Sequence, residues 1–283
     1  MTGDQNVAGA SISVTATRAS NAASNAPVGY LLHLADNALV LGQRTAEWCG
    51  HGPVLEEDIA LANIGLDLIG QARFLYQHAA ALAGGDATED TLAYFRDSRQ
   101  FRNYVLLELP HHGPLAGTAA EERDYAVTIV RNFLYSQLML LLWHALQSSR
   151  DAQLAAIASR SVKEVRYHLR HARDWLLRLG DGTIESHART QAALDHLLPY
   201  THEFWTVSQA EAAAVANATG TDVRDLQGQW NEAVDNALAA ATLRRPAAAG
   251  YLPRGKDGLH SEHLGFLLAE MQSLARQHPD ASW

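Results

Sequence analysis

The chain has 283 residues, a length that suggests one or two domains, and its 47% hydrophobic content is ample for a large core. The formal charge of −9, from 22 basic and 31 acidic residues, argues against nucleic acid or an anionic membrane as the main partner. The single cysteine, Cys49, excludes an internal disulfide and a thiolate zinc cluster, which fits a reducing cytoplasm.

The N-terminal residues 1–27 are rich in Ala, Ser, Thr and Asn. They lack a basic start followed by a continuous apolar stretch, so they do not resemble a secretory signal, and we expect a disordered tail. The longest uninterrupted apolar run, residues 138–143, is far shorter than the roughly 20 residues that cross a bilayer. The sequence therefore predicts a cytoplasmic protein without a membrane-spanning segment.

Two long helices open the predicted domain. Apolar residues at spacings of three and four predict an amphipathic helix over residues 28–48, ended by the loop at residues 50–53. The next helix begins with the acidic residues 56–58, which suit the positive end of a helix dipole, and runs to residue 83 before two glycines. At about 1.5 Å per residue it spans about 40 Å, which is the length of a bundle helix.

This second helix carries two apolar rows, and we expect both to be buried in the middle of a bundle. One row has helical spacing and the other has heptad spacing. The first row is Ile59, Ala62, Leu66 and Ile69, and the second is Leu61, Leu68 and Leu75.

Helical patterns continue through the rest of the chain, with no convincing strand, repeat or Gly-rich phosphate loop. They cover residues 88–97, 99–109, 121–147, 151–179, 183–205, 222–243 and 259–277. The segments at 121–147 and 151–179 are long, and short or moderate connections favour antiparallel neighbours. We therefore predict an all-α fold over residues 28–283, an antiparallel four-helix bundle with additional C-terminal helices.

Fourteen histidines and many carboxylates call for a test of a metal site. A dimetal carboxylate bundle takes a Glu from each of two helices and Glu-x-x-His from each of two others. No Asp or Glu occurs from residue 125 to 150, and the single Glu-x-x-His, Glu108 to His111, contains the helix breaker Pro110. In the fourth helix, Val165 stands three residues before His168. We therefore expect no complete dimetal site.

The remaining histidines, the cysteine and a basic helix surface can each be given a structural interpretation, and the basic surface also has a functional one. His111, His112, His260 and His263 fall in loops or at helix starts, where we interpret them as solvated or capping side chains. Cys49 is expected to be a packed small side chain at a helix end. The fourth helix carries a basic surface, either a solvated face with intrahelical ion pairs or a docking site for an acidic partner or nucleotide phosphates. That surface consists of Arg160, Lys163, Arg166, Arg170 and Arg173.

Several long stretches carry a resemblance to a known family. They are LADNALVLGQRTAEWCGHGPVLEEDIALANIGLDLIGQAR, RNYVLLELP, KEVRYHLRHARDWLLRLGDGTIESH and GLHSEHLGFLLAEMQ. From about residue 30 to the C-terminus the chain resembles the small, non-catalytic ferritin-like subunits of bacterial phenylacetyl-CoA epoxidase complexes. The resemblance implies a ferritin-like bundle without a cofactor of its own. It also implies two kinds of partner, a homologous catalytic subunit that holds a di-iron centre and further subunits that include a reductase.

The same resemblance implies where metal ligands were lost. Glu47, in its E-x-x-G-x-x-P setting, matches a ligand of the catalytic relatives. Leu68 and Gln71 stand where those relatives have Glu and His, Val165 replaces a Glu, and His168 keeps its histidine. These five are the vestigial ligand positions. Because a buried charge without a partner is costly, we expect Glu47 to be held by Gln71, His168 or a nearby basic residue.

The resemblance favours a structural subunit that supports the catalytic subunit in ring 1,2-epoxidation of phenylacetyl-CoA, a step of aerobic phenylacetate degradation, and that is not itself an enzyme. One alternative is an oxygen-activating enzyme with a divergent metal site that includes Glu47, Glu164 and His168. A second is a module that binds coenzyme A through the basic surface of the fourth helix. The docking candidates, for a partner or for coenzyme A, are Lys163, Arg166, Arg170 and Arg173.

Overall fold

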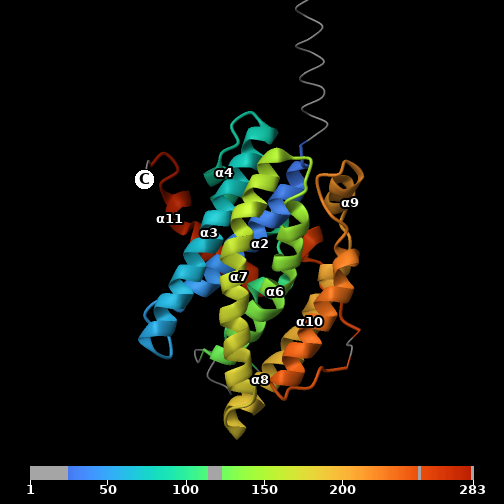
Figure 1. The fold of residues 1–283 in the computed structure, drawn as a ribbon. Helices are drawn as coiled ribbons and strands as arrows, with labels where there is room; N and C mark the ends of the chain where they lie inside the picture. The colour runs from blue at the N-terminus through green and yellow to red at the C-terminus, as the bar shows by residue number, and fades with distance from the viewer. Residues whose placement is uncertain (1–24, 114–122, 248–249, 282–283) are drawn as a thin grey trace, which may run out of the picture.

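The computed structural model describes residues 25–113, 123–247 and 250–281, and these residues form helices without a strand. Four long helices run side by side along the molecule (Figure 1). They are α2 (Val28–Ala46), α3 (Leu55–Ala83), α6 (Tyr125–Leu146) and α7 (Ala152–Gly180). The α2/α3 and α6/α7 pairs are antiparallel hairpins, so the predicted ferritin-like antiparallel bundle is confirmed.

Local sequence signals set the ends of these helices. Three acidic residues occupy the first turn of α3, and Gly84 ends the helix with a φ of 70°, a conformation that glycine adopts without strain. The side chains of Asp124 and Asp151 cap α6 and α7 by accepting hydrogen bonds from Ala126 N and Leu154 N. Each bundle helix is therefore delimited by its own sequence.

Helix α6 is the core helix of the bundle. It is long and apolar enough to cross a membrane by length and composition, but 89% of its most apolar window is buried inside the protein. It packs against α7, α8 and α10, so it is covered on several sides. Its hydrophobicity is therefore explained by its place in the core.

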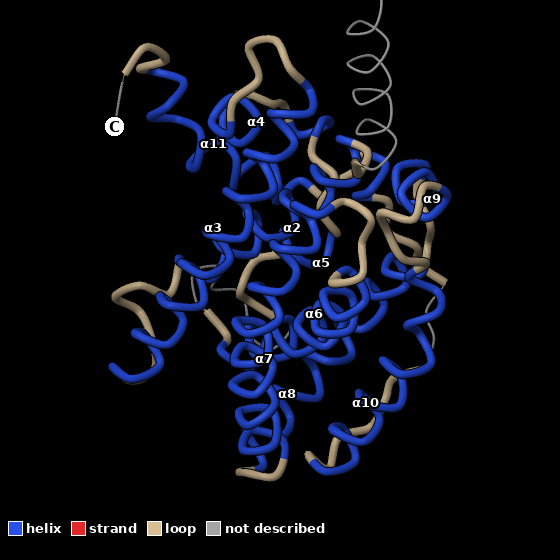
Figure 2. Tube along the Cα trace, turned by 45° about the horizontal axis from the view of Figure 1, so that its top comes forward, coloured by secondary structure: helices blue, strands red, loops and turns tan. Residues whose placement is uncertain are grey.

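Shorter helices surround the bundle (Figure 2). Before α6 these are α4 (Glu89–Tyr94), η1 (Ser98–Gln100) and α5 (Val105–Glu108). After α7 they are α8 (Ile184–Leu197), η2 (Leu198–Trp205), α9 (Gln209–Ala216), η3 (Val223–Leu226), α10 (Gln227–Ala240), η4 (Gly255–Asp257) and α11 (Glu262–Gln277). The expected additional C-terminal helices are thus present, and α11 returns to pack against α4.

Some boundaries differ from the sequence prediction. Residues 99–109 form two short elements with an extended segment between them instead of one helix. The helix expected over residues 183–205 changes to a 3₁₀ helix after Leu197, next to Pro199, which has no amide hydrogen to donate. Helix α9 was not predicted, although Ser208 and Glu211 form a capping box at its start.

The expectation for the two apolar rows of α3 is half wrong. Leu61, Leu68 and Leu75 are at most 2% exposed, as expected. In contrast, Ile59 is 54% and Leu66 is 66% exposed, whereas Ala62 and Ile69 of the same row are partly buried and Ile69 lies against Gly42 of α2. Ile59 and Leu66 are therefore surface residues.

Two further expectations concern the N-terminus and Cys49. Residues 1–24 of the expected tail lie outside the described residues, as do residues 121 and 122 of the expected third helix. Ala26, which the expected tail included, is buried and its amide donates to Asp151 Oδ2 at 2.7 Å. Cys49 is exposed, so its expected packing is wrong.

A buried ion pair attaches the loop before α11 to the rest of the fold. The Lys256 side chain is 4% exposed, and its Nζ lies 2.9 and 3.0 Å from the two carboxylate oxygens of Glu211 on α9. The same Nζ donates to Thr206 O at 2.7 Å. This pair joins segments 45 residues apart in the sequence.

Candidate functional site

Four of the five vestigial ligand positions face the interior where α3 and α7 meet. Leu68, Gln71, Val165 and His168 are each between 2% and 4% exposed. Gln71 Nε2 donates to Glu164 Oε2 at 2.9 Å, and His168 Nε2 donates to Asp67 Oδ2 at 3.0 Å. The two polar residues are therefore engaged across the α3–α7 seam.

A third link lies on the same seam nearer the start of α3. His171 Nε2 donates to Glu57 Oε2 at 2.7 Å, and the Tyr125 hydroxyl donates to the same oxygen at 2.5 Å. Burial alone would raise the pKa of Glu57, but these hydrogen bonds outweigh burial and lower the pKa below its ordinary value. Side-chain hydrogen bonds thus join α3 and α7 at three levels.

Glu47 is held by a nearby basic residue, which was one of the three expected arrangements. Its Oε1 accepts a hydrogen bond from Arg44 Nη1 at 2.7 Å, and its Oε2 lies 3.5 Å from His111 Nε2. Gln71 and His168, the other expected partners, bind other carboxylates. The negative charge of Glu47 is therefore balanced without Gln71 or His168.

His111 is buried, so the interpretation of it as a solvated or capping side chain is wrong. Its Nε2 donates to Arg44 O at 2.6 Å, which leaves Nδ1 to accept from Arg131 Nη2 at 2.9 Å. Burial and the neighbouring Arg131 hold the pKa of His111 well below its ordinary value. The pKa of the Arg131 guanidinium is lowered to about 9, mainly by burial and secondly by the charge of Arg44. A neutral imidazole thus occupies this part of the core.

Glu108 and His111 do not act together, as Pro110 led us to expect. Helix α5 ends at Glu108, and the carboxylate accepts from Asn103 Nδ2 at 2.9 Å and from His260 Nδ1 at 2.8 Å. Burial would lower the pKa of His260, but the hydrogen bond and the charge of Glu108 raise it. His260 is thus paired in the interior and is not solvated.

The donor set at the vestigial positions does not fit a di-iron centre. Leu68 and Val165 supply no oxygen or nitrogen where bridging carboxylates are needed. Within residues 25–113, 123–247 and 250–281, no three His, Cys, Asp or Glu side chains gather in an arrangement that holds a metal ion. We therefore derive no oxygen chemistry for this chain from these positions.

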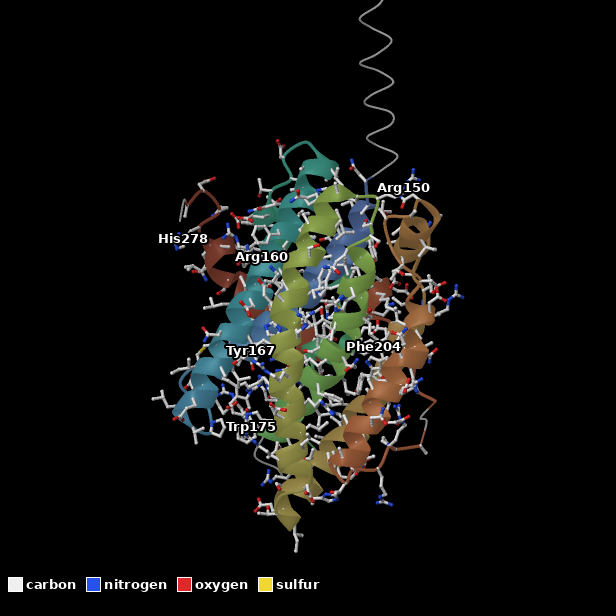
Figure 3. The ribbon with its side chains drawn as sticks, in the orientation of Figure 1. Arg150, Arg160, Tyr167, Trp175, Phe204 and His278 are labelled. Atoms are coloured by element: carbon white, nitrogen blue, oxygen red, sulfur yellow. The ribbon has the colours of Figure 1, made fainter. Side chains whose placement is uncertain are left out.

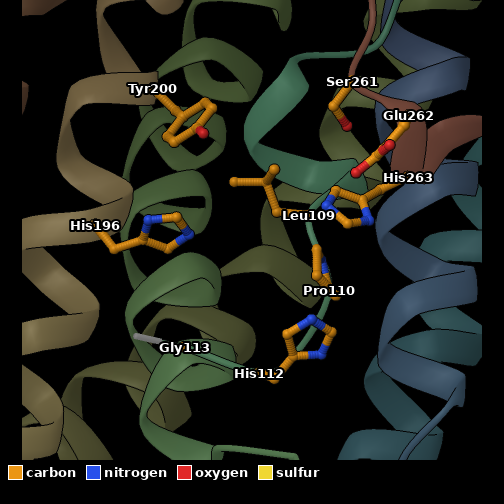
Figure 4. Close-up of a pocket in the computed structure, with 9 residues that line it drawn as sticks. All are labelled: Leu109, Pro110, His112, Gly113, His196, Tyr200, Ser261, Glu262 and His263. Atoms are coloured by element: carbon orange, nitrogen blue, oxygen red, sulfur yellow. The ribbon is translucent and has the colours of Figure 1, made fainter. Parts of the chain in front are cut away.

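An open cleft of about 580 Å³ lies between α8, the segment after α5 and the start of α11 (Figure 4). Three imidazoles line it, those of His112, His196 and His263, together with Tyr200. The pKa of His196 is lowered by burial and by His112, and the pKa of His263 is lowered by burial and by Arg44. Sequence reasoning missed this group, because His196 comes from a segment without a recognisable motif.

The docking candidates Lys163, Arg166, Arg170 and Arg173 are all exposed on α7. Among the described residues none of these four forms an ion pair, whereas Arg160 Nε lies 3.1 Å from Glu164 Oε1. The guanidinium of Arg170 lies over the Tyr167 ring, 5.6 Å from its centre. Intrahelical ion pairing therefore accounts for Arg160 but not for the four candidates.

Two comparisons with known proteins identify the family of this chain. The family model described as phenylacetic acid catabolic protein matches residues 12–283 and so extends into the expected tail. The chain is also 45% identical over 259 residues to a protein of Escherichia coli (strain K12) that is named as a subunit of 1,2-phenylacetyl-CoA epoxidase. This match covers 92% of the chain and 100% of the relative, and it confirms the resemblance seen in the sequence. The chain belongs to the phenylacetic acid catabolic protein family.

Proposed function

We propose that this chain is a structural, non-catalytic subunit of a phenylacetyl-CoA epoxidase complex in the cytoplasm. In this proposal it binds a homologous catalytic subunit that holds the di-iron centre, and further subunits, among them a reductase, complete the assembly. The complex then performs ring 1,2-epoxidation of phenylacetyl-CoA in aerobic phenylacetate degradation. The full-length similarity to a protein named as a subunit of this epoxidase supports the assignment.

The observation that carries the non-catalytic role is the side-chain chemistry at the α3–α7 seam. A dimetal centre that activates oxygen needs carboxylates that bridge and neutralise two cations. Here apolar Leu68 and Val165 occupy two of those positions, and Gln71 and His168 are bound to Glu164 and Asp67. The residues that remain hold the helices together.

The alternative of a divergent metal site would need Glu47, Glu164 and His168 to turn toward one ion. Each of them already has a partner: Arg44 for Glu47, Gln71 for Glu164 and Asp67 for His168. Freeing them would break three hydrogen bonds to charged groups, each contributing about 1.5–3 kcal/mol. The geometry therefore favours the structural role.

The direct test is the metal content of the chain purified alone after expression with ample iron. We expect less than about a tenth of an equivalent of iron, because a site with apolar residues at ligand positions does not retain ions. Stoichiometric iron that disappears in Glu47→Ala and His168→Ala variants would refute the proposal. A catalytic subunit with full epoxidase activity in the absence of this chain would also refute it.

The alternative of coenzyme A binding rests on the four cations of α7, and titration calorimetry with coenzyme A separates it from partner docking. Phosphate binding there would weaken with salt and would be lost in an Arg166→Glu/Arg170→Glu variant. Docking of a protein would instead be restored when the partner carries compensating basic residues.

A further inference from the structure

One line along α3 is apolar and uncovered. Leu55, Ile59 and Leu66 are 72%, 54% and 66% exposed, and their spacings of four and seven residues place them on one side of the helix. Between and beyond them on that side lie Ala62 and Gly70, which are small and uncharged. We call these five residues the α3 stripe. It runs about 22 Å from Leu55 to Gly70 at about 1.5 Å per residue.

The neighbouring helix α7 extends this surface with an aromatic ring and cations. Tyr167 is 40% exposed, and the adjacent His168 and His171 bind Asp67 and Glu57 of α3. Figure 3 accordingly shows Tyr167 on the edge of α7 that faces α3. Lys163 and Arg170 are four residues before and three after Tyr167, so they share its side of the helix. The α3 stripe with Lys163, Tyr167 and Arg170 is the α3–α7 face.

This face is preformed. The seam beneath it is fixed by the links Glu57–His171, Asp67–His168 and Gln71–Glu164. Exposed apolar groups on a fixed backbone lose little conformational entropy on docking, which favours binding. An exposed apolar row next to a charged rim is also the usual composition of an interface.

The charges on the face indicate what covers it. Lys163 and Arg170 have no carboxylate partner among the described residues, although the whole chain carries a charge of −9. A second copy of the chain would bring the same cations to the interface, whereas a partner with carboxylates would neutralise them. Nucleic acid would not cover the apolar stripe. The complementary surface is therefore an apolar helix ridge with Asp or Glu opposite Lys163 and Arg170, and without them opposite the exposed Glu56 of α3.

From these observations we infer that the α3–α7 face is the docking surface for an acidic helical partner, with Leu55, Ile59, Leu66 and Tyr167 as the apolar centre and Lys163 and Arg170 as the rim. This inference rests on the proposed function, in which that partner is the di-iron catalytic subunit.

The test measures the affinity of the full chain for the purified catalytic subunit by biolayer interferometry. In an Ile59→Gln/Leu66→Gln variant we expect the dissociation constant to rise about tenfold or more, since exposed interface anchors contribute most of the affinity. The matched control is Ile184→Gln/Leu274→Gln, which changes residues that are 93% and 54% exposed elsewhere on the surface. Circular dichroism and thermal unfolding should be unchanged in both variants.

The outcomes distinguish a wrong assignment of the docking face from a wrong proposed function. If the wild-type chain does not bind the catalytic subunit, the proposed function fails. If the wild type binds and the Ile59→Gln/Leu66→Gln variant binds equally well, the assignment of this face is wrong. If the isolated wild-type chain is a dimer and that variant is a monomer, a second copy covers the face and the acidic partner is refuted. Arg170→Glu should weaken binding and reduce its salt dependence.

Discussion

Replacement of Lys256 by methionine tests whether the buried pair with Glu211 secures the C-terminal part of the fold. Methionine keeps most of the apolar volume of the lysine stem but removes the charge. Glu211, 2% exposed, would then retain the Ser208 amide at 2.7 Å and His33 at 3.9 Å as its polar neighbours. Its negative charge would be left buried without a full cation.

Removing one partner of a buried ion pair costs about 3–5 kcal/mol. For a chain of this size, 1 kcal/mol corresponds to a shift of about 2–4 °C in the unfolding temperature. Lys256→Met should therefore lower the unfolding temperature by about 6–20 °C, by the same conversion. Because the orphaned Glu211 causes this loss, the double variant Lys256→Met/Glu211→Gln should recover about 2–3 kcal/mol of it.

The assay is urea unfolding of wild type, both single variants and the double variant, followed by circular dichroism at pH 7. The coupling free energy comes from the four unfolding free energies. Arg254→Met, which removes an exposed pair with Asp257 in the same loop, serves as a control with an expected change below about 1 kcal/mol. A loss of less than about 1 kcal/mol for Lys256→Met, or strictly additive losses in the double variant, would refute the reasoning.

Three further predictions concern pH and packing. Burial raises the pKa of Glu203 to about 7 in the folded chain, so the folded chain holds this proton at pH values where the unfolded chain has lost it. The free energy of unfolding should therefore fall as pH rises from about 4.5 to 7. Glu203→Gln should flatten this part of a stability–pH curve. The pKa of Glu57 is lowered, so its ionised form stabilises the fold, and this contribution is lost as pH falls through the folded pKa. Glu57→Gln should therefore cost about 1–2 kcal/mol of stability at pH 7, allowing for solvent screening, and progressively less at lower pH. A Cβ on Gly180 would clash with the carbonyl oxygen of Ala241, so Gly180→Ala should destabilise the fold by about 1–3 kcal/mol in calorimetry. The control is Gly70→Ala, whose Cβ would meet open space and which should stabilise the helix by about 0.5–1 kcal/mol.

Periodicity and capping signals were sufficient to predict the bundle. The extents of α2, α3 and α7 follow from apolar spacing, together with the acidic first turn of α3 and the glycines at the ends of α3 and α7, signals that act within a few residues. Helix α4 likewise begins after Thr88, whose side chain and that of Thr91 form a capping box. The four-residue helix α5 was predicted as part of a longer helix, and the eight-residue helix α9 was missed, since helices this short depend on tertiary packing for most of their stability.

Which face of a helix is covered could not be predicted from α3 alone. Both of its rows are apolar, and only the positions of α2 and α7 decide that Leu61 is buried and Leu66 is exposed. His111 shows the same limit, because its burial depends on Arg131 in the next long helix. The partner of Glu47 could be narrowed to three candidates from charge compensation, but the choice of Arg44 required the folded geometry.

The hydrogen bonds across the α3–α7 seam have a consequence for how this protein responds to nutrient limitation. A bundle closed by metal–ligand bonds gains part of its folding free energy from the ion and loses it when the ion is scarce. Here the two helices are joined by His171, His168 and Gln71 through hydrogen bonds to carboxylates. If the chain holds no metal, as we propose, its melting temperature should be the same with and without a strong iron chelator, and the chain would stay folded in cells starved of iron.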